Sequence, residues 1–172
     1  VHNGIIENFG ALRAELEDAG VEFASDTDSE VAVHLVARAY RDGETAGDFI
    51  ESVLAVVRRL EGHFTLVFAH ADDPGTIVAA RRSTPLVIGI GENEMFLGSD
   101  VAAFIEYTRE AVELGQDQAV VITADGYRIT DFDGNDDAAN ARVFHIDWDL
   151  SAAEKGGYDY FMLKEIAEQP TA

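Results

Sequence analysis

The first residues that could do chemistry are Asn3 and Gly4, close to the start of the sequence. The Asn side chain carries an NH2 donor, and Gly offers a backbone N–H with no Cβ beside it. Two such donors can converge on the oxyanion formed when a nucleophile attacks an amide carbonyl, and one donor is worth about 3–4 kcal/mol. Asn-Gly is also a common turn, because both residues adopt positive φ. The dipeptide alone therefore favours a turn that ends a strand.

Asp28 is the second candidate, within the stretch Ser25 to Val31 (SDTDSEV). Thr27 and Glu30 have the spacing of a capping box at the start of a helix. That leaves Asp28 without a structural role beyond complementing the helix dipole. A carboxylate at the mouth of a site is a good partner for the ammonium group of a ligand.

The remaining polar motifs predict no second site. Three serines lack the Gly-x-Ser-x-Gly context of a nucleophile: Ser25, Ser83 and Ser99. GIGENE (89–94) is interpreted as a hairpin turn rather than a phosphate loop. Residues 131–137 (DFDGNDD) alternate as in a calcium loop, but the Gly is misplaced, so a solvated acidic loop is expected. Arg81 and Arg82 are expected to be a surface pair. No metal and no organic cofactor is expected.

Composition limits the class of protein. The 172 residues are 47% hydrophobic and carry a formal charge of −21, with no cysteine. This charge is opposite to what nucleic-acid binding needs, and no apolar run is long enough for a membrane span. Many carboxylates with few lysines are typical of proteins adapted to high salt, where the Debye length falls to about 3 Å at 1 M. We therefore expect a cytoplasmic, salt-adapted protein with no nucleic-acid or membrane partner.

Hydrophobic periodicity predicts helices first and antiparallel hairpins afterwards. Helical spacing indicates helices at residues 5–19, 27–40 and 45–60, with a short strand candidate at 21–25 and a short helix at 102–106. The period then changes to two, which predicts strands at 63–71, 75–83, 85–91, 94–100 and 141–148, and a hairpin at 118–134 that turns around Ala124-Asp125-Gly126. This order favours an α+β fold over a doubly wound parallel sheet.

Taken together, HNGIIEN (2–8) followed by SDTDSEV (25–31) resembles the glutaminase domain of class II glutamine amidotransferases, an N-terminal-nucleophile (Ntn) hydrolase fold. AARRSTPLVIGIG (79–91), FLGSDVAAF (96–104) and above all YFMLKEIAEQP (160–170) are similar to glutamine–fructose-6-phosphate aminotransferases. The resemblance implies a sandwich of antiparallel sheets flanked by helices, lacking its first strands. It implies a partial glutaminase domain at 1–146 and a linker at 147–172 toward a sugar isomerase domain. The parent enzyme is expected to be a homodimer.

The resemblance also implies roles for individual residues. Asn3 and Gly4 would be the oxyanion-hole donors, and Asp28 would hold the α-ammonium group of the substrate glutamine. The family's nucleophile is an N-terminal cysteine, which this sequence does not contain, and its Arg for the α-carboxylate would lie upstream of Val1. We therefore expect a truncated chain that is inactive alone. Two alternatives are an amidotransferase of the amidophosphoribosyltransferase type and a non-catalytic ligand-binding module on the same scaffold.

Overall fold

Two antiparallel sheets form the centre of the protein. The computed structural model describes residues 1–147 and 160–169. The five-stranded sheet has the order β1 (His2–Ile6), β2 (Gly62–His70), β3 (Asp73–Arg82), β7 (Gln118–Thr123) and β8 (Gly126–Asp131). The four-stranded sheet has the order β5 (Met95–Gly98), β4 (Val87–Ile90), β6 (Glu110–Glu113) and β9 (Arg142–His145). The predicted α+β class and the predicted hairpins are therefore confirmed.

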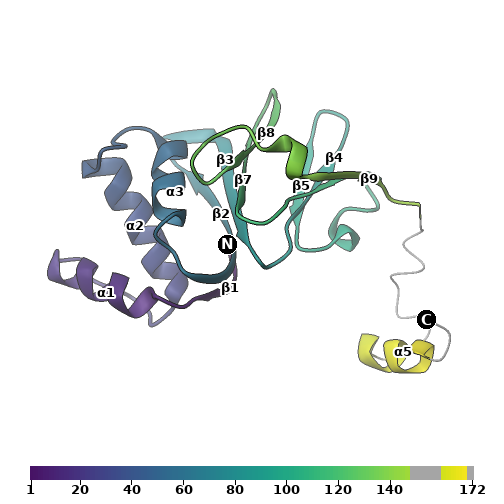
Figure 1. Cartoon of the computed structure of the whole chain (residues 1–172), viewed down its shortest axis with the longest axis horizontal. Helices are drawn as coiled ribbons and strands as arrows, with labels where there is room; N and C mark the ends of the chain where they lie inside the picture. Colours follow the sequence, from purple (N-terminus) through teal and green to yellow (C-terminus); the bar gives the residue numbers. More distant parts are fainter. Residues whose placement is uncertain (148–159, 170–172) are drawn as a thin grey trace.

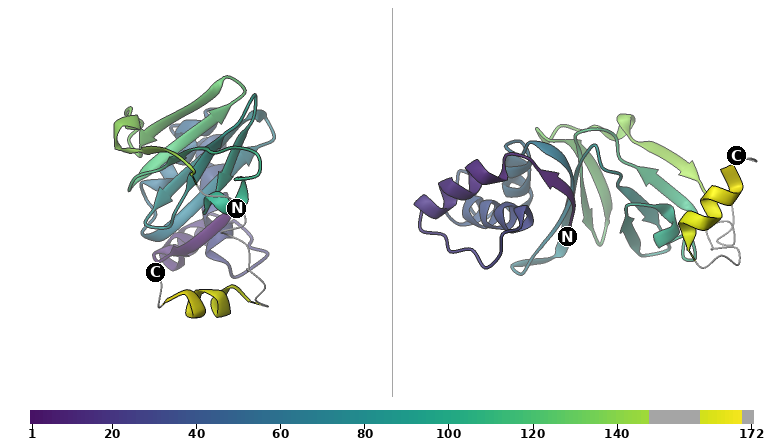
Figure 2. Two further views of the ribbon diagram at one scale, coloured as in Figure 1. Left: turned by 90° about the vertical axis from the view of Figure 1, so that its right-hand side faces the viewer. Right: turned by 90° about the horizontal axis from the view of Figure 1, so that it is seen from below.

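Three helices cover the outer face of the five-stranded sheet, and the four-stranded sheet lies on its other face (Figures 1 and 2). These helices are α1 (Phe9–Asp18), α2 (Asp28–Asp42) and α3 (Phe49–Val57). Short 3₁₀ turns follow at η1 (Val101–Ala103) and η2 (Ala138–Asn140), and the tail forms α5 (Phe161–Glu168). This is the sandwich with flanking helices that the family resemblance implies.

The alternation of side chains along the strands divides the core into two layers. On β3, Val78 and Ala80 pack toward the helices, whereas Ala79 between them packs toward the second sheet. On β7, Val121 belongs to the helix side and Val120 to the sheet side. Because both faces of the five-stranded sheet are covered, its central strands are apolar on both faces.

The outer face of the four-stranded sheet has its own small cluster, centred on Phe104 just after η1. A Cβ built on Gly89 of β4 would lie 2.6 Å from the Phe104 ring. A glycine at this position of the strand is therefore what lets the aromatic ring reach the sheet.

Several boundaries differ from the sequence-based predictions. The predicted helix at 5–19 is two elements, because residues 2–6 pair with β2 as strand β1 and α1 begins at Phe9. The predicted strand at 21–25 is irregular. The predicted helix at 45–60 begins at Phe49, because the Asp48 carboxylate caps the helix by accepting a hydrogen bond from the backbone N–H of Glu51, 3.0 Å away.

Most of the motif YFMLKEIAEQP forms helix α5, in which Met162, Leu163 and Ile166 are exposed. Pro170 and most of the predicted linker at 147–172 lie outside the described residues. The domain boundary near residue 147 therefore stays a prediction. Within the described residues, no helix is both long and apolar enough to cross a bilayer.

Candidate active site

Asn3 and Gly4 lie inside strand β1, not in a turn at its end. Asn3 is opposite Thr65 and Gly4 is opposite Phe64, and the pairing continues through Ile6 without a bulge. The predicted turn is therefore wrong, but the positive φ that the pair suggested is present, since Gly4 has a φ of 121°. β1 is an edge strand of its sheet, and both residues are exposed. The pair therefore stands at an open sheet edge, where a ligand can approach the backbone.

The Asn3 side chain points toward the second sheet. Its Nδ2 lies 3.5 Å from the hydroxyl of Ser99, which directly follows β5. From the sequence, Ser99 was considered only as a nucleophile, and it lacks the context of one. Asn3 and Ser99 are 96 positions apart, so no local sequence pattern predicts their contact. The sequence feature that includes Ser99 is the FLGSDVAAF motif.

Asp28 lies at the first turn of α2, beside the same strand. One of its carboxylate oxygens accepts a hydrogen bond from the Ile6 N–H at 2.8 Å. The other lies 3.4 Å from Nδ1 of His2. His2 and Ile6 flank the Asn3-Gly4 pair on β1, so the fold brings the two predicted parts of the site to one strand. The Asp28 side chain remains 20% exposed, which leaves room for a ligand.

The loop that leads into Asp28 is held by Glu30 in a way that differs from the predicted capping box. Thr27 is the N-cap of α2, but its side chain makes no capping hydrogen bond. The Glu30 carboxylate instead accepts hydrogen bonds from the backbone N–H groups of Ala24 and Ser25, both at 2.7 Å, and from the Ser25 hydroxyl. The Ser25 hydroxyl first, and then the Ala24 N–H, lowers the pKa of Glu30 to about 2. Glu30 thus fixes the turn before the helix.

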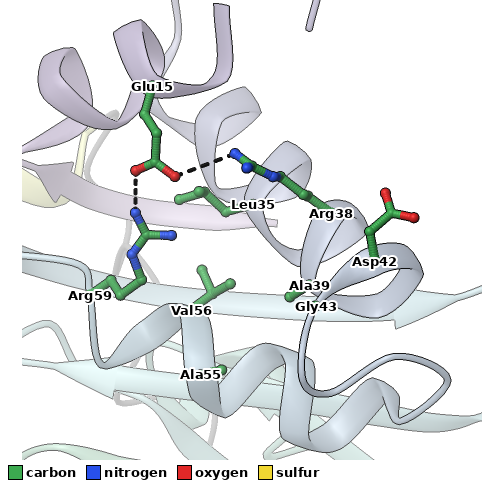
Figure 3. A pocket seen from close by; sticks show the side chains of 9 residues that line it. All are labelled: Glu15, Leu35, Arg38, Ala39, Asp42, Gly43, Ala55, Val56 and Arg59. Carbon is green, nitrogen blue, oxygen red and sulfur yellow. Dashed lines mark hydrogen bonds and ion pairs between the residues drawn. The ribbon is translucent and has the colours of Figure 1, made fainter. Parts of the chain in front are cut away.

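A separate groove of about 340 Å³ lies among α1, α2 and α3 (Figure 3). Its central feature is Glu15, whose two carboxylate oxygens pair with the guanidinium groups of Arg38 and Arg59. None of Asn3, Gly4 and Asp28 lines it. Because Glu15 pairs with both guanidinium groups and none of the candidate site residues lines this groove, we assign no ligand to it.

The other motifs from the sequence are structural. Asp131 accepts hydrogen bonds from the backbone N–H groups of Asp133 and Asn135 and from the Asn135 amide, and the Asn135 side chain chiefly lowers the Asp131 pKa. The expectation of a surface pair at Arg81-Arg82 is wrong. Arg82 donates a hydrogen bond to the Leu60 carbonyl and forms an ion pair with Asp117. Its partly buried guanidinium lies over two aromatic rings. Among the described residues no group of three His, Cys, Asp or Glu side chains is arranged for a metal ion.

Comparison with known proteins decides the family. The family model described as "Glutamine amidotransferase domain" matches residues 1–106 of the chain. The chain belongs to the glutamine amidotransferase domain family. The matched residues contain β1, the start of α2 and Ser99, and therefore the whole candidate site.

The chain is also similar to curated proteins over its full length. It is 84% identical to the glutamine–fructose-6-phosphate aminotransferase (isomerizing) of Mycobacterium leprae and 59% identical to that of Streptomyces coelicolor. Each match covers 100% of this chain, but the chain spans only 28% and 27% of those proteins. The family and the resemblance predicted from the motifs are thus confirmed.

Solved structures show the same fold. A glutamine phosphoribosylpyrophosphate amidotransferase from B. subtilis superimposes with a TM-score of 0.66 at 23% identity, over 79% of this chain and 29% of that one. A glutamine aminotransferase class-II domain protein from Silicibacter pomeroyi gives a TM-score of 0.51 at 22% identity, over 77% of this chain and 64% of that one. The predicted Ntn-hydrolase-like architecture is confirmed by these neighbours.

Proposed function

We propose that this chain is the glutamine-binding part of a glutamine–fructose-6-phosphate aminotransferase. In that enzyme, glutamine is hydrolysed to glutamate and ammonia, and the ammonia is transferred to fructose 6-phosphate to make glucosamine 6-phosphate. The observation that carries the proposal is the identity of 84% across the entire chain with a protein of that name. The position of Asn3, Gly4 and Asp28 around one open strand supports it.

Asn3 and Gly4 supply the oxyanion hole in this proposal. Val1 and Val67 exchange backbone hydrogen bonds, and the Glu7 N–H donates to the Glu61 carbonyl, so odd-numbered residues of β1 bond to β2. The N–H groups of even-numbered residues then face the open edge, as the Ile6 N–H does when it donates to Asp28. By this alternation the Gly4 N–H faces the open edge as well. The exposed Asn3 amide adds a second donor next to it.

Asp28 binds the α-ammonium group of glutamine in this proposal. Among the described residues, the polar contacts of its oxygen near His2 are at 3.4 and 3.5 Å, so this oxygen retains the capacity to accept a strong hydrogen bond. A charge-assisted bond from an ammonium group is about twice as strong as a neutral one. Asp28 would therefore select an amino acid over a simple amide.

The nucleophile is not among these 172 residues, which contain no cysteine. We propose that a cysteine from another part of the longer enzyme attacks the side-chain amide carbon of glutamine. The C–N bond breaks, ammonia leaves with a proton from the thiol, and the resulting thioester is hydrolysed to glutamate and free thiol. Asn3 and Gly4 hold the negative oxygen of the tetrahedral intermediates in both steps.

The rest of the parent enzyme is proposed from its relatives. Residues 1–146 would be the glutaminase part and 147–172 the connection to a sugar isomerase domain, which binds the sugar phosphate. Homodimerisation, a cytoplasmic location and adaptation to high salt stay predictions. The amidophosphoribosyltransferase alternative is less well supported, because that likeness has 23% identity and concerns the fold alone.

A full-length enzyme containing this chain tests the proposal. With glutamine and fructose 6-phosphate it should form glutamate and glucosamine 6-phosphate in equal amounts. Asn3→Asp, which removes the NH2 donor at constant size, should lower both rates about 10²-fold or more. Asn93→Asp is the matched control, because Asn93 lies in an exposed turn with a φ of 62° that Asp also tolerates. A requirement for a phosphoribosyl acceptor instead, or no glutamine hydrolysis, contradicts the proposal.

A further inference from the structure

We propose that His2 is a positioning residue that orients the Asp28 carboxylate for the α-ammonium group of glutamine. The inference rests on the proposed function and extends it to a residue that does not itself touch the substrate. Its basis is a chain of polar contacts that runs from β1 to the first turn of α2.

The His2 side chain is almost completely buried, with 6% of its surface exposed. Its Nδ1 lies 2.8 Å from the hydroxyl of Ser29 and 3.4 Å from the Asp28 carboxylate. Its Nε2 is buried and has no hydrogen-bond partner among the described atoms. The polar contacts of the imidazole are therefore all on one side, and that side faces Asp28.

This asymmetry argues against a purely structural histidine. A buried polar atom without a partner is destabilising, and an apolar ring at this position would avoid that cost. Apolar side chains, among them Leu66 and Phe68, share with His2 the lining of a small hollow of about 90 Å³. What histidine supplies beyond an apolar ring is the Nδ1 contact with Ser29 and Asp28.

The proposal requires one tautomer of His2. Ser29 has one hydroxyl proton, and its oxygen lies 3.5 Å from the Asp28 carboxylate as the donor. If that proton goes to Asp28, the hydroxyl must accept from His2, so Nδ1 carries the ring proton. The chain then runs from Nδ1–H to the Ser29 hydroxyl and on to Asp28.

The consequence is a carboxylate with one oxygen fixed and the other oriented but still able to accept a strong hydrogen bond. One oxygen is fixed by the Ile6 N–H at 2.8 Å, and the other is oriented by His2 and Ser29. Both anchors on β1 flank Asn3-Gly4, so the spacing between the oxyanion donors and the ammonium partner depends on a single strand. His2 thereby links the two ends of the substrate site.

Two substitutions of His2 separate positioning from size in the full-length enzyme. The amide nitrogen of Asn corresponds to Nδ1 and that of Gln to Nε2. His2→Gln should raise the KM for glutamine about tenfold, with kcat changed less than about threefold, because the α-ammonium contact is shared by substrate and transition state. His2→Asn should recover most of this loss.

A specific readout is the preference for glutamate over glutarate as competitive inhibitors, since glutarate lacks the ammonium group. We expect His2→Gln to reduce this preference about tenfold and Ser29→Ala to shift it in the same direction. In the Asp28→Asn background, His2→Gln should have no further effect on the preference. Equal thermal midpoints for the variants show that they are folded, and if His2→Gln does not fold, Ser29→Ala provides the same test.

The outcomes distinguish this inference from the proposed function. If Asp28→Asn lowers the preference for glutamate but His2→Gln and Ser29→Ala leave it unchanged, His2 does not position Asp28. If Asp28→Asn itself leaves the preference unchanged, the assignment of Asp28 to the α-ammonium group fails first. A loss with His2→Asn as large as that with His2→Gln also overturns the role of Nδ1.

Discussion

Gly4 of β1 faces the carbonyl oxygen of His63 on β2 so closely that a Cβ on Gly4 would lie 2.0 Å from that oxygen. With a φ of 121°, this position excludes any residue with a side chain. Gly4 is therefore required by the pairing of β1 with β2, and not only because a ligand must approach its N–H.

Gly4→Ala should destabilise the protein by about 2–4 kcal/mol, because β1 must move away from β2 to admit the methyl group. The measurement is the urea midpoint of unfolding. Gly10→Ala is the matched control, because Gly10 lies in α1 and a methyl group there would meet no atom within 4 Å, so it should stabilise by about 0.5–1 kcal/mol. Equal midpoints for the two variants would be inconsistent with this strand geometry.

Glu30 predicts a specific pH dependence of stability. Its folded-state pKa of about 2 is below the unfolded value of 4.5, chiefly because of the hydrogen bond from Ser25. The contribution of Glu30 is therefore fully present above about pH 4.5 and is lost as the pH falls toward 2. The free energy of unfolding of Glu30→Gln should be lower than that of the unchanged protein at pH 6, and the difference should shrink steadily between pH 4.5 and 2.

Glu92→Gln, in an exposed turn, is the control for Glu30 and should show no such convergence. A constant difference between Glu30→Gln and the unchanged protein across this pH range is the result that excludes the assigned hydrogen bonds.

The contacts of Arg82 predict that a positive charge alone is not sufficient at this position for full stability. Its guanidinium pairs with Asp117 at 2.6 Å, donates to the Leu60 carbonyl, and lies over the rings of Phe64 and Phe132 at 5.5 and 5.1 Å. Arg82→Lys keeps the charge but loses the planar fork, so we expect a loss of about 1–3 kcal/mol in the free energy of unfolding. Arg128→Lys, on the exposed part of β8, should change stability by less than about 0.5 kcal/mol. If both variants lose a comparable free energy of unfolding, the contacts of the Arg82 guanidinium do not contribute to stability as assigned.

The isolated 172-residue chain should not hydrolyse glutamine, because it contains no cysteine. Ammonia release by the purified chain should equal that of its Asn3→Asp variant. Any release above that variant would show that another nucleophile operates in these residues.

Strands with strong alternation could be predicted from local sequence alone. The hairpin of β7 and β8 has two β-branched apolar runs predicted to join around Ala124-Asp125-Gly126, and the hairpin appears there, with Gly126 as the first residue of β8. The length of β1 could not be predicted in the same way. A strand was expected to end at Asn3-Gly4 and a helix to begin at residue 5, whereas pairing with β2, about 60 residues away, extends the strand to Ile6.

The candidate site shows the same limit. Asn3, Gly4 and Asp28 were recognised by residue type and by resemblance, but their common position at one strand edge depends on the Ile6–Asp28 hydrogen bond. Glu30 satisfies the capping-box spacing, yet it binds Ala24 and Ser25, because the loop before α2 folds back onto it. Ser99 and His2 take part only through tertiary contacts, which spacing does not encode.

The central claim is that Asn3 and Gly4 stabilise an oxyanion while Asp28 binds the α-ammonium group of the same glutamine. Its most direct test is the glutaminase kinetics of Asn3→Asp and Asp28→Asn in a full-length enzyme. We predict that Asn3→Asp lowers kcat about 10²-fold or more with a small change in KM, whereas Asp28→Asn raises KM about 10- to 100-fold with a small change in kcat. A reversed pattern, or the same change in kcat and KM for both variants, would contradict the account.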